Sequence, residues 1–258
     1  MANESVVLLA FFSALTLMLA HLFSNRIYRY SEHHRNRMLS FFGGIAVAYV
    51  FLDLLPRLEA THVHIERIFG DLPAFLDNIS VPGLSLMGFL IFFGLEHLAL
   101  RTRHTKNKKT GNGFSSIHTS NVIFVVHFIN LAFFNLVIGY VLRFEAEIGI
   151  LSLLLYTSAL SLHFIILDKT MEEHYEHLYL KYGRYVASLM PLIGWGISVF
   201  FPENPSEGYL LLALVSGIVL FNAIKNEVPN RGGKNSGIFI AGALFYSVLL
   251  LIIAWLRG

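Results

Sequence analysis

Eight long apolar runs constrain this chain more than any other feature of its sequence. A helix needs about 20 apolar residues to cross the hydrocarbon core of a bilayer, and these runs approach that length. They are 6–23, 39–55, 84–100, 122–142, 148–167, 186–201, 209–224 and 238–256. Because hydrocarbon offers no partners to backbone amide and carbonyl groups, such runs cross it as helices. We therefore predict an all-α, polytopic membrane protein with eight transmembrane helices in a single domain, 1–258.

The composition excludes soluble and nucleic-acid-binding proteins. Hydrophobic residues make up 55% of the chain and charged residues 14%, against roughly 25% charged residues in a typical soluble domain. The formal net charge is +2, which leaves no basic surplus to bind phosphates, so we expect no nucleic-acid partner. The chain has no cysteine, which excludes disulfides and thiolate metal sites.

The basic residues lie in alternate loops. Fifteen of the 19 Lys and Arg residues follow the first, third, fifth and seventh runs, and only Arg57, Arg67, Arg143 and Arg257 fall at the opposite ends. Loops rich in Lys and Arg stay in the cytoplasm. We therefore expect both termini outside, acidic segments on the outer side, and insertion in the plasma (cell inner) membrane.

The second and seventh runs share a spaced pattern. Gly44-Ile45 is followed by Asp53 and Pro56, and Gly217-Ile218 is followed at the same spacing by Asn226 and Pro229. Since the two runs cross in opposite directions, this pattern indicates a 3+2+3 plan in which two inverted repeats flank a central pair of spans. The alternative is that Gly and Pro are simply frequent in membrane helices.

Polar residues inside the expected bilayer are concentrated in that central pair. The fourth span contains His127, Asn130 and Asn135, and the fifth contains His163, with Asp168 at its inner end. Polar side chains in hydrocarbon must be paired or face a cavity, so they are functional candidates. His127, Asn130 and His163 lie at similar depth and could coordinate a divalent cation. The competing interpretation is hydrogen bonding between helices, which uses the same residue types.

Other polar residues are weaker candidates for accessory metal binding or for the access and exit routes of a cation. They are Asp53, His62, His64, His174 and His177. Each has a simpler role, because Asp53 can reach water and the four histidines fall in polar stretches on the membrane surface. Glu96 and His97 end the third span beside Arg101, where an interfacial salt bridge is the expected role.

Three stretches resemble the ZIP (Zrt/Irt-like) family of divalent-metal transporters. The second span and its loop, LSFFGGIAVAYVFLDLLPRLEATH, have that family's paired glycines and Leu-Pro ending. GFLIFFGLEHLAL is similar to its third span, and SGIVLFNAIKNEVP to its seventh. The resemblance implies eight spans in a 3+2+3 inverted-repeat bundle and import of zinc or a similar ion through a site between the fourth and fifth spans.

The fourth span departs from the family pattern. ZIP proteins carry His-Asn-x-x-Asp/Glu-Gly there, with a further Gly four residues on. Aligning that last Gly with Gly139 puts Asn130 at the His, Phe134 at the acid and Asn135 at the Gly, while His127 lies one turn away. An acidic ligand of the family is therefore replaced by Phe134.

The fifth span keeps more of its pattern, which in the family is His-Glu-x-Pro-x-Glu. His163 and, at the last acid, Asp168 are retained, whereas Phe164 and Ile166 replace the first Glu and the Pro. The resemblance thus implies a reduced metal site with fewer carboxylates. Its residues would be His127, Asn130, His163 and Asp168.

These observations leave two functions of different class. One is a transporter that moves a divalent metal cation, zinc or similar, into the cytoplasm, with the metal as substrate and no resident cofactor. The other is a ZIP-fold protein that has lost metal transport and serves as an interaction partner or carries another solute. An intramembrane hydrolase ranks last because the chain lacks His-Glu-x-x-His and Gly-x-Ser-x-Gly, so we expect no enzyme. The expected partners are the lipid bilayer and the metal ion; homodimerisation stays open.

Overall fold

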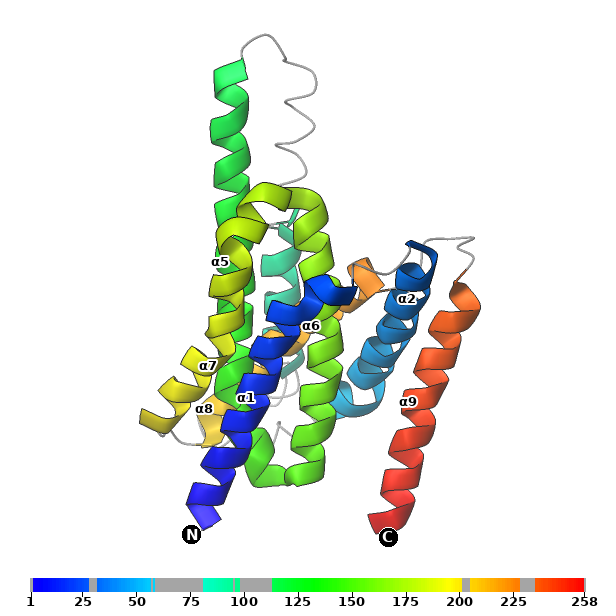
Figure 1. The fold of residues 1–258 in the computed structure, drawn as a ribbon. Helices are drawn as coiled ribbons and strands as arrows, with labels where there is room; N and C mark the ends of the chain where they lie inside the picture. Colours follow the sequence, from blue (N-terminus) through cyan, green and yellow to red (C-terminus); the bar gives the residue numbers. More distant parts are fainter. Residues whose placement is uncertain are drawn as a thin grey trace.

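A computed structural model describes residues 2–27, 32–56, 58, 81–94, 96–97, 113–200, 205–227 and 235–257. Within these residues the secondary structure is helical and includes no strand. The helices form one bundle (Figure 1). They are α1 (Ala2–Ile27), α2 (Glu32–Tyr49), η1 (Val50–Leu54), the helix Val81–Gly94, α5 (Gly113–Ile148), α6 (Ile150–Leu178), η2 (Tyr179–Gly183), α7 (Arg184–Phe200), α8 (Pro205–Asn222), η3 (Ala223–Glu227) and α9 (Ser236–Arg257).

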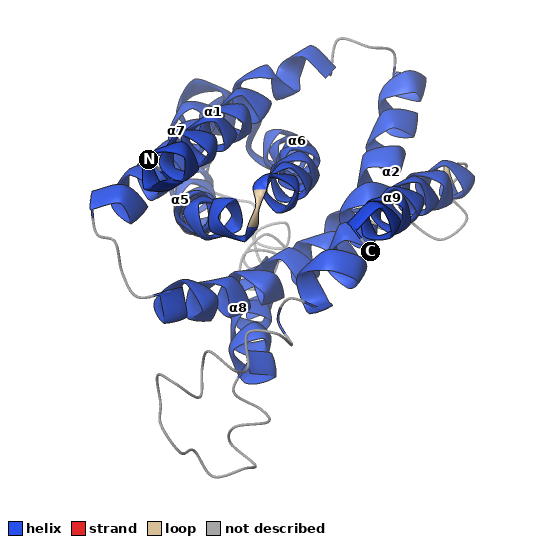
Figure 2. Ribbon diagram, turned by 90° about the horizontal axis from the view of Figure 1, so that it is seen from below, coloured by secondary structure: helices blue, strands red, loops and turns tan. Residues whose placement is uncertain are grey.

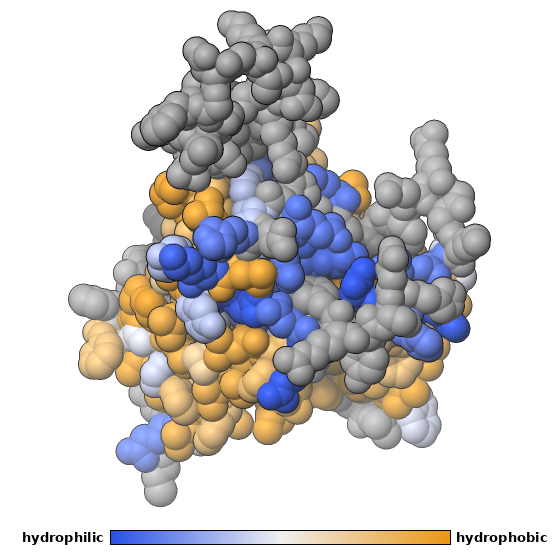
Figure 3. Space-filling model, turned by 45° about the horizontal axis from the view of Figure 1, so that its top comes forward, coloured by the Kyte–Doolittle hydropathy of each residue, from blue (hydrophilic) through white to orange (hydrophobic). Residues whose placement is uncertain are grey.

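The described helices are those of an all-α membrane protein, as predicted. Five segments are long and apolar enough to cross a bilayer: Glu4–Arg26, His34–Leu54, Phe124–Ile148, Ile150–Glu173 and Ser236–Ile253. The other three predicted spans correspond to the shorter apolar helices Val81–Gly94 and Leu210–Lys225 and to α7, which has 17 residues. Large apolar side chains lie on the outside, including Leu251 and Trp255, which are 69% and 80% exposed. Hydrophilic residues gather near the end of the bundle that faces forward in Figure 3, above hydrophobic flanks.

The two central helices are longer than predicted. α5 begins at Gly113, before the expected start at 122, and its first turns project beyond the bundle (Figure 1). α6 continues past 167 to Leu178 with a kink at Tyr175. Charge ends a membrane span but not a helix, because water can satisfy the helix beyond the lipid. The sequence pattern located the apolar spans but underestimated the lengths of these two helices.

The bundle brings the start of α1 and the end of α9 to the same end (Figure 1). α5 turns directly into α6 at Gly149, whose φ of +148° is a backbone conformation that side chains disfavour. This tight reversal holds α5 and α6 side by side. In the view along the bundle, α1 and α7 lie beside this pair, and α2 and α9 pack together on the other side (Figure 2).

Three helix pairs approach closely enough to require glycine: α2 with α9, α8 with the helix Val81–Gly94, and α5 with α7, where Gly139 and Gly194 make the contact. A Cβ on Gly44 of α2 would lie 2.0 Å from the Phe239 carbonyl oxygen of α9, and one on Gly242 of α9 would lie 2.1 Å from that of Phe41. In the second pair, a Cβ on Gly217 of α8 would lie 1.7 Å from the Ser85 carbonyl oxygen, and one on Gly88 would lie 2.0 Å from that of Leu214. Each glycine thus meets the carbonyl three residues before the partner glycine. Small residues of this kind allow membrane helices to pack backbone to backbone.

The α2–α9 pair and the pair of α8 with Val81–Gly94 also share a local distortion. The π-helical turns η1 and η3 begin at Val50 and Ala223, the same number of residues after Gly44 and Gly217. α2 and α8 run in opposite directions in Figure 1. The glycines matched in the sequence therefore have the same packing register and the same following π-turn. Such turns widen a helix and are frequent at functional sites.

Candidate functional site

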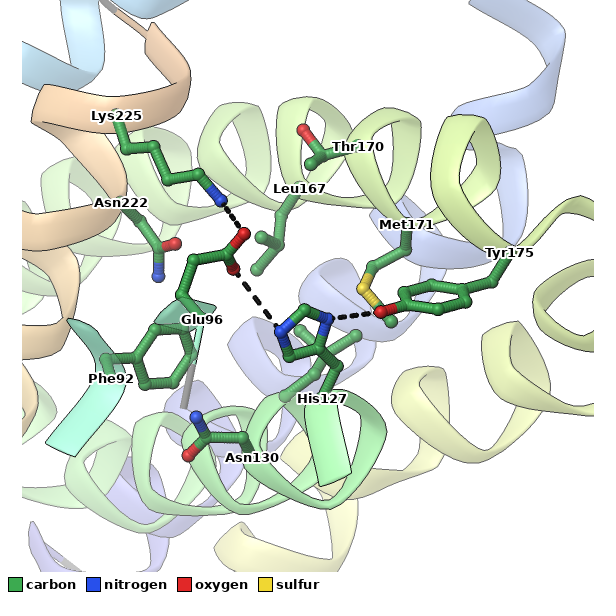
Figure 4. A pocket seen from close by; sticks show the side chains of 11 residues that line it. Phe92, Glu96, His127, Asn130, Leu167, Thr170, Met171, Tyr175, Asn222 and Lys225 are labelled. Carbon is green, nitrogen blue, oxygen red and sulfur yellow. Dashed lines mark hydrogen bonds and ion pairs between the residues drawn. The ribbon is translucent and has the colours of Figure 1, made fainter. Parts of the chain in front are cut away.

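A pocket with several polar groups in a largely apolar lining lies near one end of the bundle. Its space is about 490 Å³, part of which is open to solvent. The segment around Val81–Gly94 contributes Phe92 and the following Glu96, and α5, α6, α8 and η3 supply the other walls (Figure 4). The lining residues are Phe92, Glu96, His127, Asn130, Leu131, Leu167, Thr170, Met171, Tyr175, Asn222 and Lys225.

Glu96 lies at the centre of the charged groups in this pocket. Its Oε1 lies 2.5 Å from Nζ of Lys225, and its Oε2 lies 3.5 Å from Nε2 of His127. The Glu96 side chain is 17% exposed and that of Lys225 is 31% exposed. A carboxylate this far out of water needs a cation nearby. In the structure that cation is the ammonium group of Lys225.

His127 is held on both sides. Its Nδ1 lies 2.5 Å from the Tyr175 hydroxyl, and its Nε2 faces Glu96 (Figure 4). Both contacts are satisfied when Tyr175 donates to Nδ1 and the Nε2 proton points at the carboxylate. Lys225, Glu96, His127 and Tyr175 thus form a continuous polar chain across the pocket, contributed by segments far apart in the sequence.

Two amides complete the polar lining. Asn130 follows His127 by one turn of α5, and Asn222 ends α8 just before η3. Leu131 and Leu167 add apolar surface from α5 and α6. Carboxylate, imidazole and amide groups are the donors that borderline and hard divalent cations accept.

The structure separates the four metal residues predicted from the sequence. His127 and Asn130 line the pocket. His163 is buried and its ring packs against those of Phe134 and Phe164, with centroid distances of 5.8 Å and 6.4 Å. Asp168 makes its contacts in another cluster. Within the described ranges, no three His, Asp or Glu side chains are grouped closely enough to hold a metal ion.

Asp168 belongs to a buried cluster between α1, α5, α6 and η2. Its Oδ1 lies 2.7 Å from Nδ1 of His21 and accepts a hydrogen bond from the Tyr179 hydroxyl. The other ring nitrogen of His21, Nε2, lies 3.0 Å from Nδ2 of Asn135. The His21 ring also stacks on Phe164 at a centroid distance of 4.4 Å. Asn135, at the position of the family's glycine, therefore takes part in helix-to-helix hydrogen bonding.

The accessory residues are mostly remote from the pocket lining or outside the described part of the chain. Asp53 lies half-buried on η1, and His177 is exposed near the end of α6. His62 and His64 lie outside the described residues, as does the side chain of His174. Their predicted roles stay predictions.

The roles of several residues in the pocket and in the buried cluster around Asp168 were not predicted from the sequence. Glu96 was expected to pair at the interface with Arg101, which lies outside the described residues; its described partners are Lys225 and His127. His21 was missed, although it is a histidine within an apolar run and the rule that selected His127 applies to it equally. Tyr175 and Tyr179 carry no sequence signal, because their roles depend on how the end of α6 bends.

Tyr179→Phe tests whether the buried cluster stabilises the bundle. It removes a hydroxyl that donates to the buried Asp168 carboxylate, and we expect a loss of about 2 kcal/mol in the free energy of unfolding. Tyr185→Phe is the control, since Tyr185 is 57% exposed, and it should change the value by less than about 0.5 kcal/mol. Denaturant titration in detergent micelles measures both. Equal effects of the two substitutions would contradict a stabilising role for the cluster.

The comparisons with known proteins add no family. No protein-family model and no curated protein matches the sequence. The resemblance to ZIP transporters therefore rests on the motifs in the second, third and seventh spans, and the site is interpreted from its own geometry.

Proposed function

We propose that this chain is an inverted-repeat membrane permease for a divalent cation such as zinc, with Glu96 as the main anionic ligand. The observation that carries the proposal is the pocket in which the Glu96 carboxylate faces both Lys225 and His127. Helices of both expected repeats and of the central pair α5 and α6 line it. Substrate sites of inverted-repeat transporters typically lie at such a meeting of repeats.

The repeat assignment is supported by packing as well as by sequence. Gly44 with Gly242, and Gly217 with Gly88, make equivalent backbone contacts. The helices that carry Gly44 and Gly217, α2 and α8, each continue into a π-turn. We infer that spans one to three and six to eight are the two repeats of a 3+2+3 bundle. Alternating access would then come from movement of the repeats relative to α5 and α6.

The donor set suits a cation that tolerates nitrogen and oxygen ligands. Glu96 supplies carboxylate oxygens, His127 an imidazole nitrogen, and Asn130 and Asn222 amide oxygens. Zinc accepts the carboxylate and imidazole donors, and the amide oxygens are weaker donors. The predicted ligands His127 and Asn130 thus keep their roles, and Glu96 and Asn222 join them.

The ammonium group of Lys225 balances the charge of the Glu96 carboxylate when no divalent cation is bound. It lies 2.5 Å from Glu96, so a tethered cation occupies the position that a metal ion would need. A divalent cation that reaches Glu96 must displace it. The long, partly exposed Lys225 side chain can move toward water at modest cost.

The same ion pair favours the second function. If Lys225 never leaves Glu96, the pocket is a fixed internal salt bridge and the chain is a ZIP-fold protein without metal transport. The absence of a grouped set of three His, Asp or Glu residues within the described ranges is in keeping with that alternative. The two functions differ in whether zinc competes with Lys225.

Lys225→Met provides the test of that competition. Removing the tethered charge should tighten zinc binding about tenfold, or about 1.4 kcal/mol, because zinc no longer displaces an ammonium group from Glu96. Isothermal calorimetry on the full chain in detergent measures the dissociation constant. Lys169→Met is the matched control, since Lys169 pairs with the exposed Glu173 at 3.3 Å and should leave the constant unchanged. An undetectable interaction of zinc with both the wild type and Lys225→Met would favour the second function.

A further inference from the structure

The most deeply buried ionisable pair in the described bundle has no role in the cation pocket. His21 of α1 is fully buried and Asp168 of α6 is 1% exposed, with 2.7 Å between Nδ1 and Oδ1. Ionisable groups inside a membrane bundle are costly and mark proton or ion pathways. Their hydrogen bonds indicate which ion this pair accommodates.

The contacts fit a neutral His21 and an ionised Asp168. The His21 Nδ1 proton and the Tyr179 hydroxyl both point to Oδ1 of Asp168. The Asn135 amide nitrogen faces the unprotonated Nε2 of His21 and donates to the Ala187 carbonyl at 3.3 Å. Among the described residues, Oδ2 of Asp168 and Oδ1 of Asn135 have no hydrogen-bond partner. One negative charge is therefore buried with spare acceptor capacity.

The described Lys and Arg residues form no ion pair with Asp168. Its neighbour Lys169 pairs with Glu173. On α7, Arg184 lies one turn before Ala187 and is buried, and its Nε has no hydrogen-bond partner among the described residues. A proton on His21 would supply the missing positive charge next to the carboxylate.

Protonation would also change the packing. A proton on Nε2 of His21 needs an acceptor 3.0 Å away, where the Asn135 amide nitrogen now lies. Turning the amide over presents Oδ1 to that proton and removes the hydrogen bond from Asn135 to Ala187 of α7. The cluster thus has two hydrogen-bonded states that differ by one proton, and the change alters the contact between α5 and α7.

We propose that His21 and Asp168 form a proton-binding site and that its occupancy is coupled to the cation pocket. The same helices build both sites: α5 carries Asn130 and Asn135, and α6 carries the adjacent Leu167 and Asp168. The coupling rests on the proposed function, whereas the proton site rests on the buried cluster alone. The ligand is a proton, and the element that responds is the Asn135 amide between α1 and α7.

The proton site is tested by nuclear magnetic resonance of the full chain in lipid nanodiscs, with isotope-labelled histidine. In a scan from about pH 5 to pH 8, one histidine signal should change with pH, and this signal should be absent from His21→Gln. In Asp168→Asn its midpoint should shift, since the carboxylate that faces the ring is gone. Asp168→Asn also identifies the signal if His21→Gln does not fold. A His21 signal that stays constant over this range overturns the proposal.

The coupling is tested on the same signal with zinc chloride. Because linkage is reciprocal, saturating zinc should shift the His21 midpoint in the wild type and leave it unchanged in Glu96→Gln. An unchanged midpoint in the wild type overturns the coupling. If the midpoint moves while vesicles take up no zinc, the proton site stands and the transport proposal fails, so the two failures are distinguishable.

Discussion

Gly217→Leu is expected to lower the free energy of unfolding by about 3 kcal/mol. A side chain at this position would start 1.7 Å from the Ser85 carbonyl oxygen, and that atom belongs to the backbone of a packed helix, so it cannot move aside as a flexible side chain would. α8 must separate from the helix Val81–Gly94, which also carries the pocket residue Phe92. Denaturant titration in mixed micelles, followed by tryptophan fluorescence, measures the loss.

Gly196→Leu is the matched control for this substitution. Gly196 lies in the second half of α7, and a Cβ there would meet no atom within 4 Å. The same change of residue should therefore alter the free energy of unfolding by less than about 0.5 kcal/mol. If both leucines cost the same, the close helix contact at Gly217 is not what holds α8 in place.

The Gly-Ile pattern found in the sequence marks two positions of close helix contact, because backbone-to-backbone contact leaves a residue signature, but it did not predict which helices pair. Only glycine fits where a carbonyl lies within 2.1 Å of the Cβ position, as at Gly44 and Gly217. The Gly-Ile pattern with its polar and proline residues could therefore be found by spacing alone. Gly88 and Gly242 were not matched, although each lies five residues after another glycine, Gly83 or Gly237, and two residues before a leucine, Leu90 or Leu244.

The candidate site was only partly predictable. His127 and Asn130 share a helix face, and that relation follows from the 3.6-residue period. The pairing of Glu96 with Lys225 joins segments that are far apart in the chain, and no local pattern reports it. The pairing of His21 with Asp168 is of the same kind, because it depends on α1 packing against α6.

Phe134 is a further residue whose structural role did not follow from the sequence pattern. The family pattern placed it where an acid belongs, and the structure buries it completely against His163 and Phe164. The central pair of helices is therefore filled by aromatic packing at the level where a metal was expected. The polar groups lie to one side, in the pocket around Glu96 and in the cluster around Asp168.

Glu96→Gln is the substitution with the largest expected effect on function. It keeps the shape of the side chain and removes the charge that faces Lys225 and His127. A divalent cation in a site without carboxylate loses its strongest electrostatic partner. We expect zinc uptake to fall at least about tenfold. Glu173→Gln is the matched control, because Glu173 is exposed and pairs only with Lys169 in the described contacts.

Zinc uptake into vesicles that contain the purified chain tests the central claim most directly. Zinc chloride is added outside, and a dye enclosed in the vesicles reports its arrival. If Glu96 binds the transported cation, uptake should be well above that of empty vesicles for the wild type and for Glu173→Gln, and near that of empty vesicles for Glu96→Gln. Wild-type uptake equal to that of empty vesicles, or full uptake by a folded Glu96→Gln protein, would contradict the claim.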